Sequence, residues 1–300
     1  MFFYIEEKDE DKRLDAFLAE SLPMFSRSKI QAEIKKNNVF VNNKSVKASY
    51  NLKEDDVIEC KFNDEVNILK PMPENIPIEI VWEDENMAVV NKPSNMLTHP
   101  TDIEMSKTLV NALLYIYNDN LSTINGYLRP GIIHRLDRNT SGLIMIAKNN
   151  KTHEFLVEEM KKKNFVKKYV AIVKGIIIAD EFEIALPIGR HLTQPHKQCV
   201  RDDGKEALTL VKVLNRYNNA TLVELTLVTG RTHQIRVHMA YLGHPIYNDT
   251  LYGFGKPKIK TEEQVLQSYK LEFTKPFSDQ RIMLEIPFDE KIQKVIKFLG

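Results

Sequence analysis

The first 70 residues have the apolar spacing of two short helices followed by strands. Four large apolar residues between positions 14 and 22 recur at helical intervals, which places them on one face of a helix. Ser28 stands three positions before Gln31, the spacing of a capping box, and predicts the start of a second helix. An alternating run at 39–41 predicts the first strand of a small sheet. We therefore expect residues 1–70 to form a compact α+β unit.

A second, larger domain is expected after a proline-rich segment. Residues 71–77 contain three prolines and predict a stiff, extended linker. Beyond it, over residues 78–300, helices and strands do not alternate regularly, and no glycine-rich nucleotide-binding turn occurs. The pattern favours an α+β domain with a mixed, mainly antiparallel sheet and flanking helices. Two segments have helical spacing and three alternate as half-buried strands do: 108–117, 151–163, 168–174, 222–229 and 281–288.

Composition narrows the possible compartment. The chain has no run of eighteen apolar residues, so no membrane-spanning helix is expected. The first residues turn acidic after position 5, unlike a signal peptide. Cys60 and Cys199 are far apart and form no CxxC pair, which is typical of a reducing compartment. These features predict a cytoplasmic protein.

Basic residues are clustered, although the formal net charge is only +1. Residues 26–50 contain six cations and one anion, and residues 148–174 contain eight lysines and three glutamates. Such clusters can bind a polyanion such as RNA, or they can be solvated helix faces. The sequence leaves both interpretations open for each cluster.

Two polar segments hold the candidate chemistry. In the first, Asp137 lies among His134 and three arginines and is followed by a Thr-Ser-Gly turn and an apolar strand. Asp137 taken alone fits a structural salt bridge as well as a catalytic group. In the second segment a strand ends near Thr229, Gly230 turns the chain, and Arg231 precedes a predicted helix that Gly243 ends.

These segments resemble the signatures of the RluA-type pseudouridine synthases. The motif HRLD-xx-TSG occupies residues 134–142, and GRTHQIRVH occupies residues 230–238. The N-terminal unit is similar to the small RNA-binding domain that many of these enzymes share with a small-subunit ribosomal protein. Further matching segments are at 13–15, 26–28, 39–42, 91–93, 99–100, 167–175 and 204–207. The resemblance covers nearly the whole chain and implies isomerisation of uridine to pseudouridine in structured RNA.

The resemblance also implies roles for individual residues. Asp137 would be the catalytic carboxylate, with Arg231 as the counter-ion that keeps it ionised. Tyr169 would stack on the uracil ring and accept or relay a proton. Arg135 would fill the gap in the RNA helix when the uridine is flipped out, and His134 would lie against the substrate.

The implied partner is RNA, with large-subunit ribosomal RNA favoured over tRNA. Arg27, Lys29 and Lys35 would contact RNA from the N-terminal unit. Because the detached base stays in the pocket, no cofactor or metal is required, and we expect a monomer. The spacing of His191, His196 and Cys199 matches no closed zinc site. Two alternatives remain: a non-catalytic RNA-binding ribosome-assembly factor, and an N-glycosidase that would release free uracil.

The chain departs from the family pattern at five glycine positions. Asparagine and aspartate are the other residues that best tolerate positive φ angles. We therefore expect these turns to be preserved. The five replacements are Asn37, Asn43, Asp55, Asn95 and Asn248.

Overall fold

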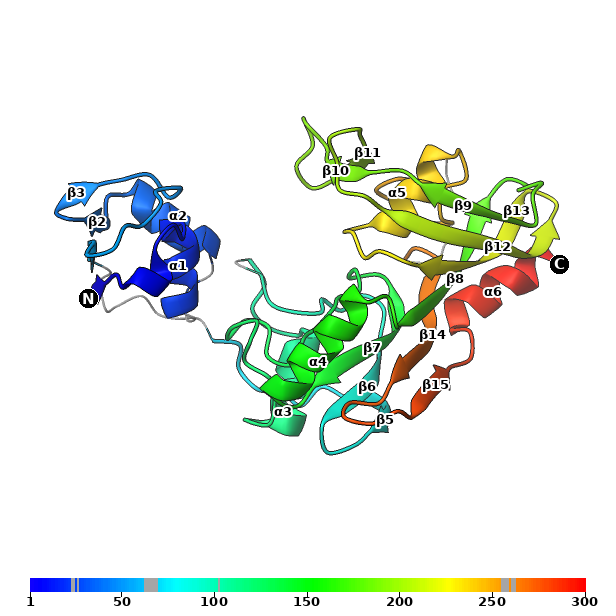
Figure 1. Ribbon diagram of the computed structural model, residues 1–300. Coiled ribbons are helices and arrows are strands. Elements are labelled where there is room, and N and C mark those ends of the chain that lie inside the picture. Colours follow the sequence, from blue (N-terminus) through cyan, green and yellow to red (C-terminus); the bar gives the residue numbers. More distant parts are fainter. Residues whose placement is uncertain (23–24, 26, 62–69, 102, 255–258, 260–262) are drawn as a thin grey trace. The chain divides into compact units, whose positions relative to one another are not determined.

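A computed structural model describes residues 1–22, 25, 27–61, 70–101, 103–254, 259 and 263–300. Ser26, part of one N-terminal motif, lies outside the described residues. The chain forms two compact units, each with its own core (Figure 1). The first comprises residues 1–71 and 125–130, and the second comprises residues 72–124 and 131–300.

The first unit packs two helices against a small antiparallel sheet. Its apolar core includes Leu14, Leu18 and Ile30 from the helices and Ile58 from the sheet, all 0% exposed. The strand order is β1-β4-β2-β3. The elements are β1 (Phe2–Tyr4), η1 (Glu7–Asp9), α1 (Leu14–Ser21), α2 (Arg27–Lys35), β2 (Val39–Val41), β3 (Lys44–Ser45) and β4 (Val57–Cys60).

Both predicted N-terminal helices are present. The second begins at Arg27, two residues before Lys29, the first helical residue that the capping-box spacing indicates. Strand β1 precedes the helices and pairs with β4, whereas the sequence pattern predicted strands only after them. No local pattern indicates β1, because its pairing with β4 joins segments that are far apart in the sequence, such as Phe2 with Glu59.

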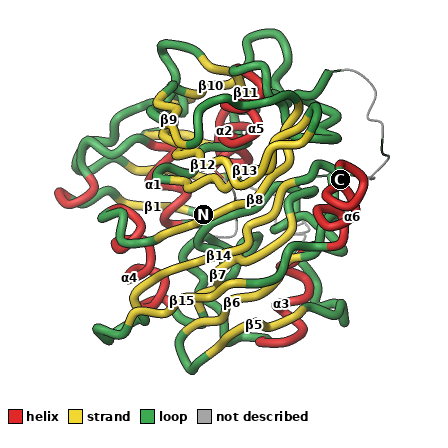
Figure 2. The backbone as a smooth tube through the Cα atoms, turned by 90° about the vertical axis from the view of Figure 1, so that its right-hand side faces the viewer, coloured by secondary structure: helices red, strands yellow, loops and turns green. Residues whose placement is uncertain are grey.

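The second unit is built on one mixed sheet. Its described residues form nine strands in the order β5-β6-β7-β14-β8-β13-β12-β9, with β15 paired to β14 (Figure 2). Only the β7–β14 pair is parallel, so the predicted mixed, mainly antiparallel α+β fold is confirmed. The strands are β5 (Glu79–Glu83), β6 (Met87–Lys92), β7 (Ser141–Ala147), β8 (Val166–Lys174), β9 (Glu181–Ala185), β12 (Leu208–Tyr217), β13 (Ala220–Leu227), β14 (Leu266–Thr274) and β15 (Arg281–Glu285).

Helices cover both faces of this sheet. Helices α3 (Leu109–Tyr117) and α5 (Gln234–Tyr241) contribute to the core on one face. Helices α4 (Asn150–Lys161) and α6 (Glu290–Leu299) contribute to the core on the other face. Strand β7 is buried along its whole length because both of its faces are covered. A hairpin of β10 (Ile188–Arg190) and β11 (Gln198–Val200) stands apart from the sheet.

The proline-rich segment lies against the second unit. Asn111 on α3 donates a hydrogen bond from its side chain to the carbonyl of Met72 at 2.8 Å and accepts one at its own carbonyl from the Glu74 amide at 3.0 Å. No regular secondary structure forms between residues 70 and 78. Whether this segment acts as a linker stays a prediction.

The five asparagine and aspartate replacements all have left-handed backbone angles. Their φ values lie between 58° at Asn37 and Asn95 and 64° at Asp55. The expectation that these residues preserve the turns is confirmed, including at Asn248, where φ is 60°.

Candidate active site

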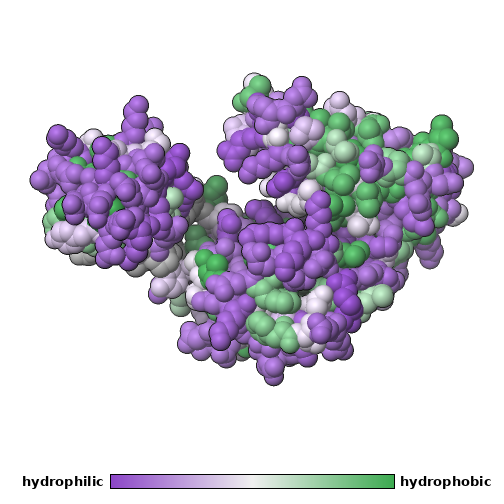
Figure 3. Space-filling view, in the orientation of Figure 1, coloured by the Kyte–Doolittle hydropathy of each residue, from purple (hydrophilic) through white to green (hydrophobic). Residues whose placement is uncertain are grey.

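A cavity of about 550 Å³ in the second unit gathers the main predicted site residues. Its wall is formed by the segments 133–137 and 227–236, the C-terminal part of α4 and the start of β8. Hydrophilic side chains gather over α4 and over the β10–β11 hairpin, with a hollow between them (Figure 3). The predicted residues that line the cavity are His134, Arg135, Asp137, Tyr169 and Arg231.

Side chains from outside the segment hold the Asp137 loop, residues 134–140, in place. Thr98, 2% exposed, donates from its hydroxyl to the carbonyl of Leu136 at 2.8 Å. Ser94 donates to the carbonyl of Asn139 at 2.9 Å, and Gln264 donates to the hydroxyl of Thr140 at 2.8 Å. Because each bond fixes a neighbour of Asp137, the loop is preorganised around the carboxylate.

Lys92 is the central support of this loop. Its side chain is fully buried, and its Nζ donates to the carbonyls of Pro93 and Met96, each at 2.8 Å, and of Arg138 at 3.1 Å. Burial, helped by the nearby charge of Lys291, lowers the pKa of Lys92 to about 7. A buried ammonium without an anion is costly, and the three carbonyl dipoles offset part of that cost.

Gly142 lets the parallel strand β14 approach the end of the loop. Its φ is +113°, and a Cβ built there would stand 2.0 Å from the carbonyl oxygen of Ser268. Any side chain would therefore push β14 away from β7. The glycine of the Thr-Ser-Gly turn is thus a requirement of strand packing.

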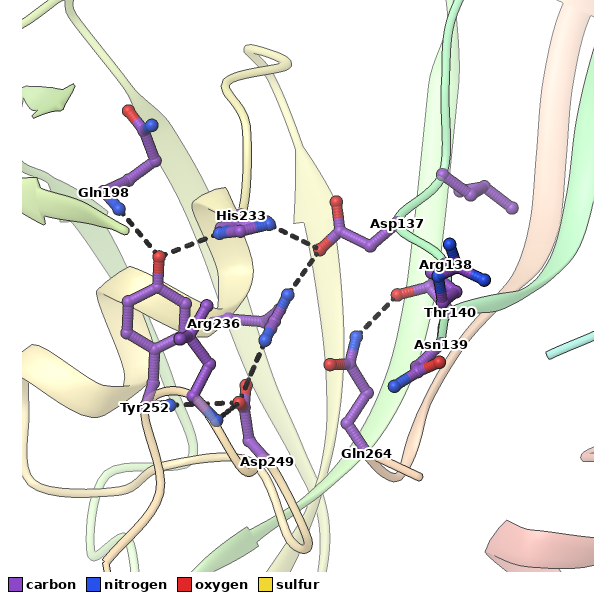
Figure 4. Close-up of polar contacts among 12 residues, drawn as sticks. Asp137, Arg138, Asn139, Thr140, Gln198, His233, Arg236, Asp249, Tyr252 and Gln264 are labelled. Atoms are coloured by element: carbon purple, nitrogen blue, oxygen red, sulfur yellow. Dashed lines mark hydrogen bonds and ion pairs between the residues drawn. The ribbon is translucent and has the colours of Figure 1, made fainter. Parts of the chain in front are cut away.

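Asp137 forms an ion pair with Arg236. Its Oδ2 accepts a hydrogen bond from Nη1 of Arg236 at 3.0 Å (Figure 4). Among the described residues, none donates to the other carboxylate oxygen, Oδ1. The ion pair stabilises the ionised carboxylate and leaves one oxygen available to a bound molecule.

Arg236 is itself fixed by a second carboxylate. Its Nε and Nη2 donate to Oδ2 and Oδ1 of Asp249 at 2.7 and 3.0 Å. Asp249 is 0% exposed in its side chain. Burial opposes ionisation of Asp249, but the hydrogen bonds and charge of Arg236 outweigh it and lower the pKa. A bidentate pair of this kind fixes the guanidinium plane, and the remaining nitrogen points at Asp137.

His233 approaches the same carboxylate oxygen of Asp137 as Arg236 does. Its Nε2 is 3.9 Å from Oδ2 of Asp137, and its Nδ1 is 2.8 Å from the hydroxyl of Tyr252 (Figure 4). The backbone amide of Gln198 donates to the same hydroxyl at 2.8 Å, so the hydroxyl proton is free to point at Nδ1. Burial lowers the pKa of His233, although the Asp137 charge opposes the shift. The favoured form is a neutral imidazole with its N–H toward Asp137.

Arg231 does not serve as the counter-ion of Asp137, which corrects the sequence prediction. Arg231 is exposed, and its Nε donates to the carbonyl of Glu206 at 2.8 Å. Its backbone amide donates to Oε1 of Gln234 at 2.9 Å. The helix begins only at Gln234, so Arg231 precedes the helix while Arg236 lies in its first turn and reaches the loop. Both arginines belong to the same signature, 230–238, and the buried one, Arg236, is the one that pairs with Asp137.

Four further residues of this site were not predicted from the sequence: Lys92, Arg236, Asp249 and Tyr252. Arg236 was inside the quoted signature, and Lys92 was inside the matched segment 91–93. Asp249 and Tyr252 had no local signal because their contacts depend on the fold.

Tyr169 is buried in the sheet beneath the cavity, at 6% exposure. Burial raises the pKa of its hydroxyl, and the charge of Asp137 adds to the shift. The neutral phenol is therefore the stable form, which is a poor base at neutral pH. Stacking or proton relay suits this residue better than proton abstraction does.

His134 and Arg135 differ in what they contact. Nε2 of His134 accepts a hydrogen bond from the amide of Met145 at 3.0 Å, and burial lowers the pKa of its imidazole to about 3. This bond braces β7, although the ring also lines the cavity. Arg135 is exposed and makes no side-chain hydrogen bond or ion pair with a described residue.

The three predicted RNA contacts in the first unit also differ. Arg27 donates two hydrogen bonds to the fully buried Asp15, at 3.0 and 3.2 Å, and Lys29 pairs with Glu33 at 3.0 Å. Lys35 is exposed at the end of α2 and pairs with no described carboxylate. Lys35 is thus the most available of the three cations.

Among the described residues, no group of three or more histidine, cysteine, aspartate or glutamate side chains is arranged to hold a metal ion. Within the same residues, no helix is long and apolar enough to span a bilayer.

Comparison with known proteins decides the family. Residues 86–241 match the RNA pseudouridylate synthase family, and residues 12–58 match the S4 domain. The chain belongs to the RNA pseudouridylate synthase family. This pseudouridine synthase isomerises uridine to pseudouridine in RNA and carries an RNA-binding S4 domain at its N-terminus, as the resemblance implied.

Relatives of this pseudouridine synthase span nearly its whole length. A Bacillus subtilis protein named as an uncharacterized RNA pseudouridine synthase is 40% identical, over 98% of this chain and 96% of the relative. The ribosomal large subunit pseudouridine synthase D of Borreliella burgdorferi is 39% identical, over 88% of this chain and 83% of the relative. The enzyme of that name from Xanthomonas campestris is 34% identical, with coverages of 96% and 89%.

A solved structure has the same fold. Human RNA pseudouridylate synthase domain containing 1 aligns with a TM-score of 0.60 at 24% identity, over 75% of this chain and 96% of that one. The likeness supports the mixed α+β fold of the pseudouridine synthase.

Proposed function

We propose that this pseudouridine synthase modifies large-subunit ribosomal RNA in the cytoplasm, with Asp137 as its catalytic carboxylate. The observation that carries the proposal is the ion pair of Asp137 with Arg236, in a cavity where Asp137 is the one carboxylate among the described lining residues. The printed names of several relatives, which specify the large ribosomal subunit, support the choice of RNA.

The chemistry requires a carboxylate at the sugar. Breaking the bond between C1′ and N1 leaves positive character on the ribose, which a carboxylate can stabilise or attack. The uracil then turns, C5 bonds to C1′, C5 loses its proton and N1 gains one, so the product is an isomer of the substrate. Oδ1 of Asp137, which accepts no hydrogen bond from a described residue, is the atom available for this task.

The remaining residues position the nucleotide. Tyr169 stacks on the uracil ring as a neutral phenol and passes on the C5 proton only as a relay. Arg135, exposed beside the loop, fills the gap that the flipped uridine leaves in the RNA helix. His134 supports β7 and lies against the substrate from the cavity wall.

Arg231 is assigned to RNA binding. It lines the main cavity and also a neighbouring polar cavity of about 530 Å³. Arg190, Arg201 and Lys205 line that second cavity as well, and Asp203, which pairs with Arg201, is its one carboxylate among the described lining residues, so cations outnumber anions there too. Such a lining suits the phosphate backbone of RNA. In the first unit, Lys35 and its neighbours Arg27 and Lys29 would add contacts of the same kind.

The variant Asp137→Asn tests the catalytic assignment. It removes the charge at nearly constant volume, so fold and RNA binding should persist while pseudouridine formation falls by at least about three orders of magnitude. Release of tritium from RNA labelled at uridine C5 measures the rate, and thermal unfolding confirms the fold. Residual turnover above about 1% of wild type would contradict the assignment.

Pseudouridine mapping in cells that lack the gene tests the substrate. Loss of sites in large-subunit ribosomal RNA is expected. Loss confined to tRNA would contradict the choice of RNA while leaving the isomerase activity intact.

A further inference from the structure

Cations outnumber anions strongly in the wall of the active-site cavity. Asp137 is the one carboxylate among its described lining residues, and Arg236 already neutralises it. The lining cations are Arg135, Lys161, Lys163, Lys167, Arg231 and Arg236.

Lys167 differs from the other lining lysines because it is half-buried. Lys161 and Lys163 are exposed on and just after the last turn of α4, and Lys161 pairs with Glu158. The ammonium of Lys167 forms no ion pair or hydrogen bond with any described residue. Burial lowers its pKa, since nothing nearby in the described chain compensates the charge. Its position is therefore costly unless an external anion enters.

Lys168, the next residue along β8, has an ion-pair partner where Lys167 has none among the described residues. Lys168 points to the opposite face of β8, where it pairs with Glu224 at 2.9 Å. Because side chains alternate along a strand, Lys167 shares its face with Tyr169, and both line the cavity. The fold thus supplies an anion for one lysine of the pair and leaves the other facing the substrate.

The spacing fits one nucleotide. Residues two apart on a strand are separated by about 6.6 Å. The proposed function places the uracil on Tyr169, and a phosphate group lies at a comparable distance from the base of its own nucleotide. From Tyr169, the direction to Lys167 leads back toward the end of α4, where the exposed Lys161 and Lys163 also line the cavity.

We propose that Lys167 binds the RNA phosphodiester group adjacent to the target uridine and contributes to RNA affinity rather than to the chemical step. The inference rests on the proposed function. The phosphodiester supplies the missing negative charge, and a half-buried lysine that has already lost part of its hydration has less further desolvation cost to meet on binding.

The test uses the full chain and unmodified large-subunit ribosomal RNA transcribed in vitro. Single-turnover rates are measured against enzyme concentration at several salt concentrations for wild type, Lys167→Met, Lys167→Arg and Lys151→Met. Lys151→Met is the matched control, because Lys151 is an exposed lysine of α4 that does not line the cavity.

Lys167→Met should raise the half-saturating enzyme concentration by about tenfold. It should also reduce the slope of log affinity against log salt by roughly 0.7–0.9, the value for one lost phosphate contact. The rate at saturation should stay within about threefold of wild type. Lys167→Arg should recover most of the affinity, and Lys151→Met should change neither quantity appreciably.

An unchanged affinity and salt slope in Lys167→Met would overturn the inference. So would a lower saturating rate at unchanged affinity, since Lys167 would then act on the chemistry. Removing an unpaired charge should not destabilise the fold, and if Lys167→Met does not fold, Lys167→Gln takes its place in the same measurements. A wild-type enzyme that forms no pseudouridine in this RNA would instead count against the proposed function.

Discussion

The two sides of the active-site cavity differ in whether their charged side chains are buried and paired with one another or exposed to solvent. On the Asp137 side, the carboxylate meets Arg236, which Asp249 fixes from behind, and buried Lys92 supports the loop backbone. On the turn at residues 229–233, Arg231 is exposed, and its side chain pairs with no carboxylate among the described residues but donates a hydrogen bond to a backbone carbonyl.

The difference separates chemistry from RNA binding. A reacting carboxylate needs a fixed geometry, which buried and mutually paired charges supply. A surface that binds a polyanion needs cations that are not already neutralised by the protein. Substitutions on the two sides should therefore differ in their effects on stability, on catalytic rate and on RNA affinity.

Arg236→Met should have the largest effect. It leaves Asp249 as an uncompensated buried charge, and breaking such a pair costs about 3–5 kcal/mol of the free energy of unfolding. Chemical denaturation measures the free energy of unfolding of wild type, Arg236→Met and Arg231→Met, and Arg231→Met is the matched control. Equal losses in the two variants would erase the distinction between the arginines.

Lys92 should make stability depend on pH. The pKa of Lys92 is about 7 in the folded chain, against the ordinary lysine value of 10.5 that applies in the unfolded chain. Between these two pH values, the unfolded chain binds the proton and the folded chain does not. Raising the pH from 7 to 10 should therefore stabilise the fold, by at most about 1.4 kcal/mol per pH unit from this group.

The variant Lys92→Met isolates this contribution. The difference in unfolding free energy between wild type and Lys92→Met should grow in favour of wild type as pH rises through that window. Parallel curves would show that Lys92 keeps an ordinary pKa despite its burial.

Arg231→Met should have the smallest effect and change RNA binding alone. Affinity for unmodified large-subunit ribosomal RNA should fall by up to about tenfold, and the salt slope should decrease by about 0.7–0.9, as for one phosphate contact. Filter binding at several salt concentrations measures both. A loss of affinity without any change in salt slope would exclude a phosphate contact.

The sequence predicted the fold class because apolar residues recur at every second position in long half-buried strands and every three to four positions in amphipathic helices. Strand β8, for example, was expected at 168–174 and is found at Val166–Lys174. Positive φ angles were predictable at Asn95 and Asn248, because local backbone preference is a property of the residue.

The ion pairs were not predictable in the same way. Arg231 and Arg236 lie five residues apart, and choosing the partner of Asp137 requires knowing where α5 begins and which side of it is buried. Asp249 contacts Arg236 only because the segment after α5 folds back, which no local pattern records. No local pattern indicates that Lys92 is buried, so its supporting role could not be predicted from the sequence.

The rate of single-turnover pseudouridine formation at saturating enzyme, compared between Arg231→Met and Arg236→Met, tests the central claim most directly. At saturation, differences in RNA affinity no longer contribute, so the rate reports the chemistry and the positioning of Asp137. Arg231→Met should stay within about threefold of wild type, whereas folded Arg236→Met should fall by at least about a hundredfold. A large loss in Arg231→Met with Arg236→Met near wild type would contradict the account.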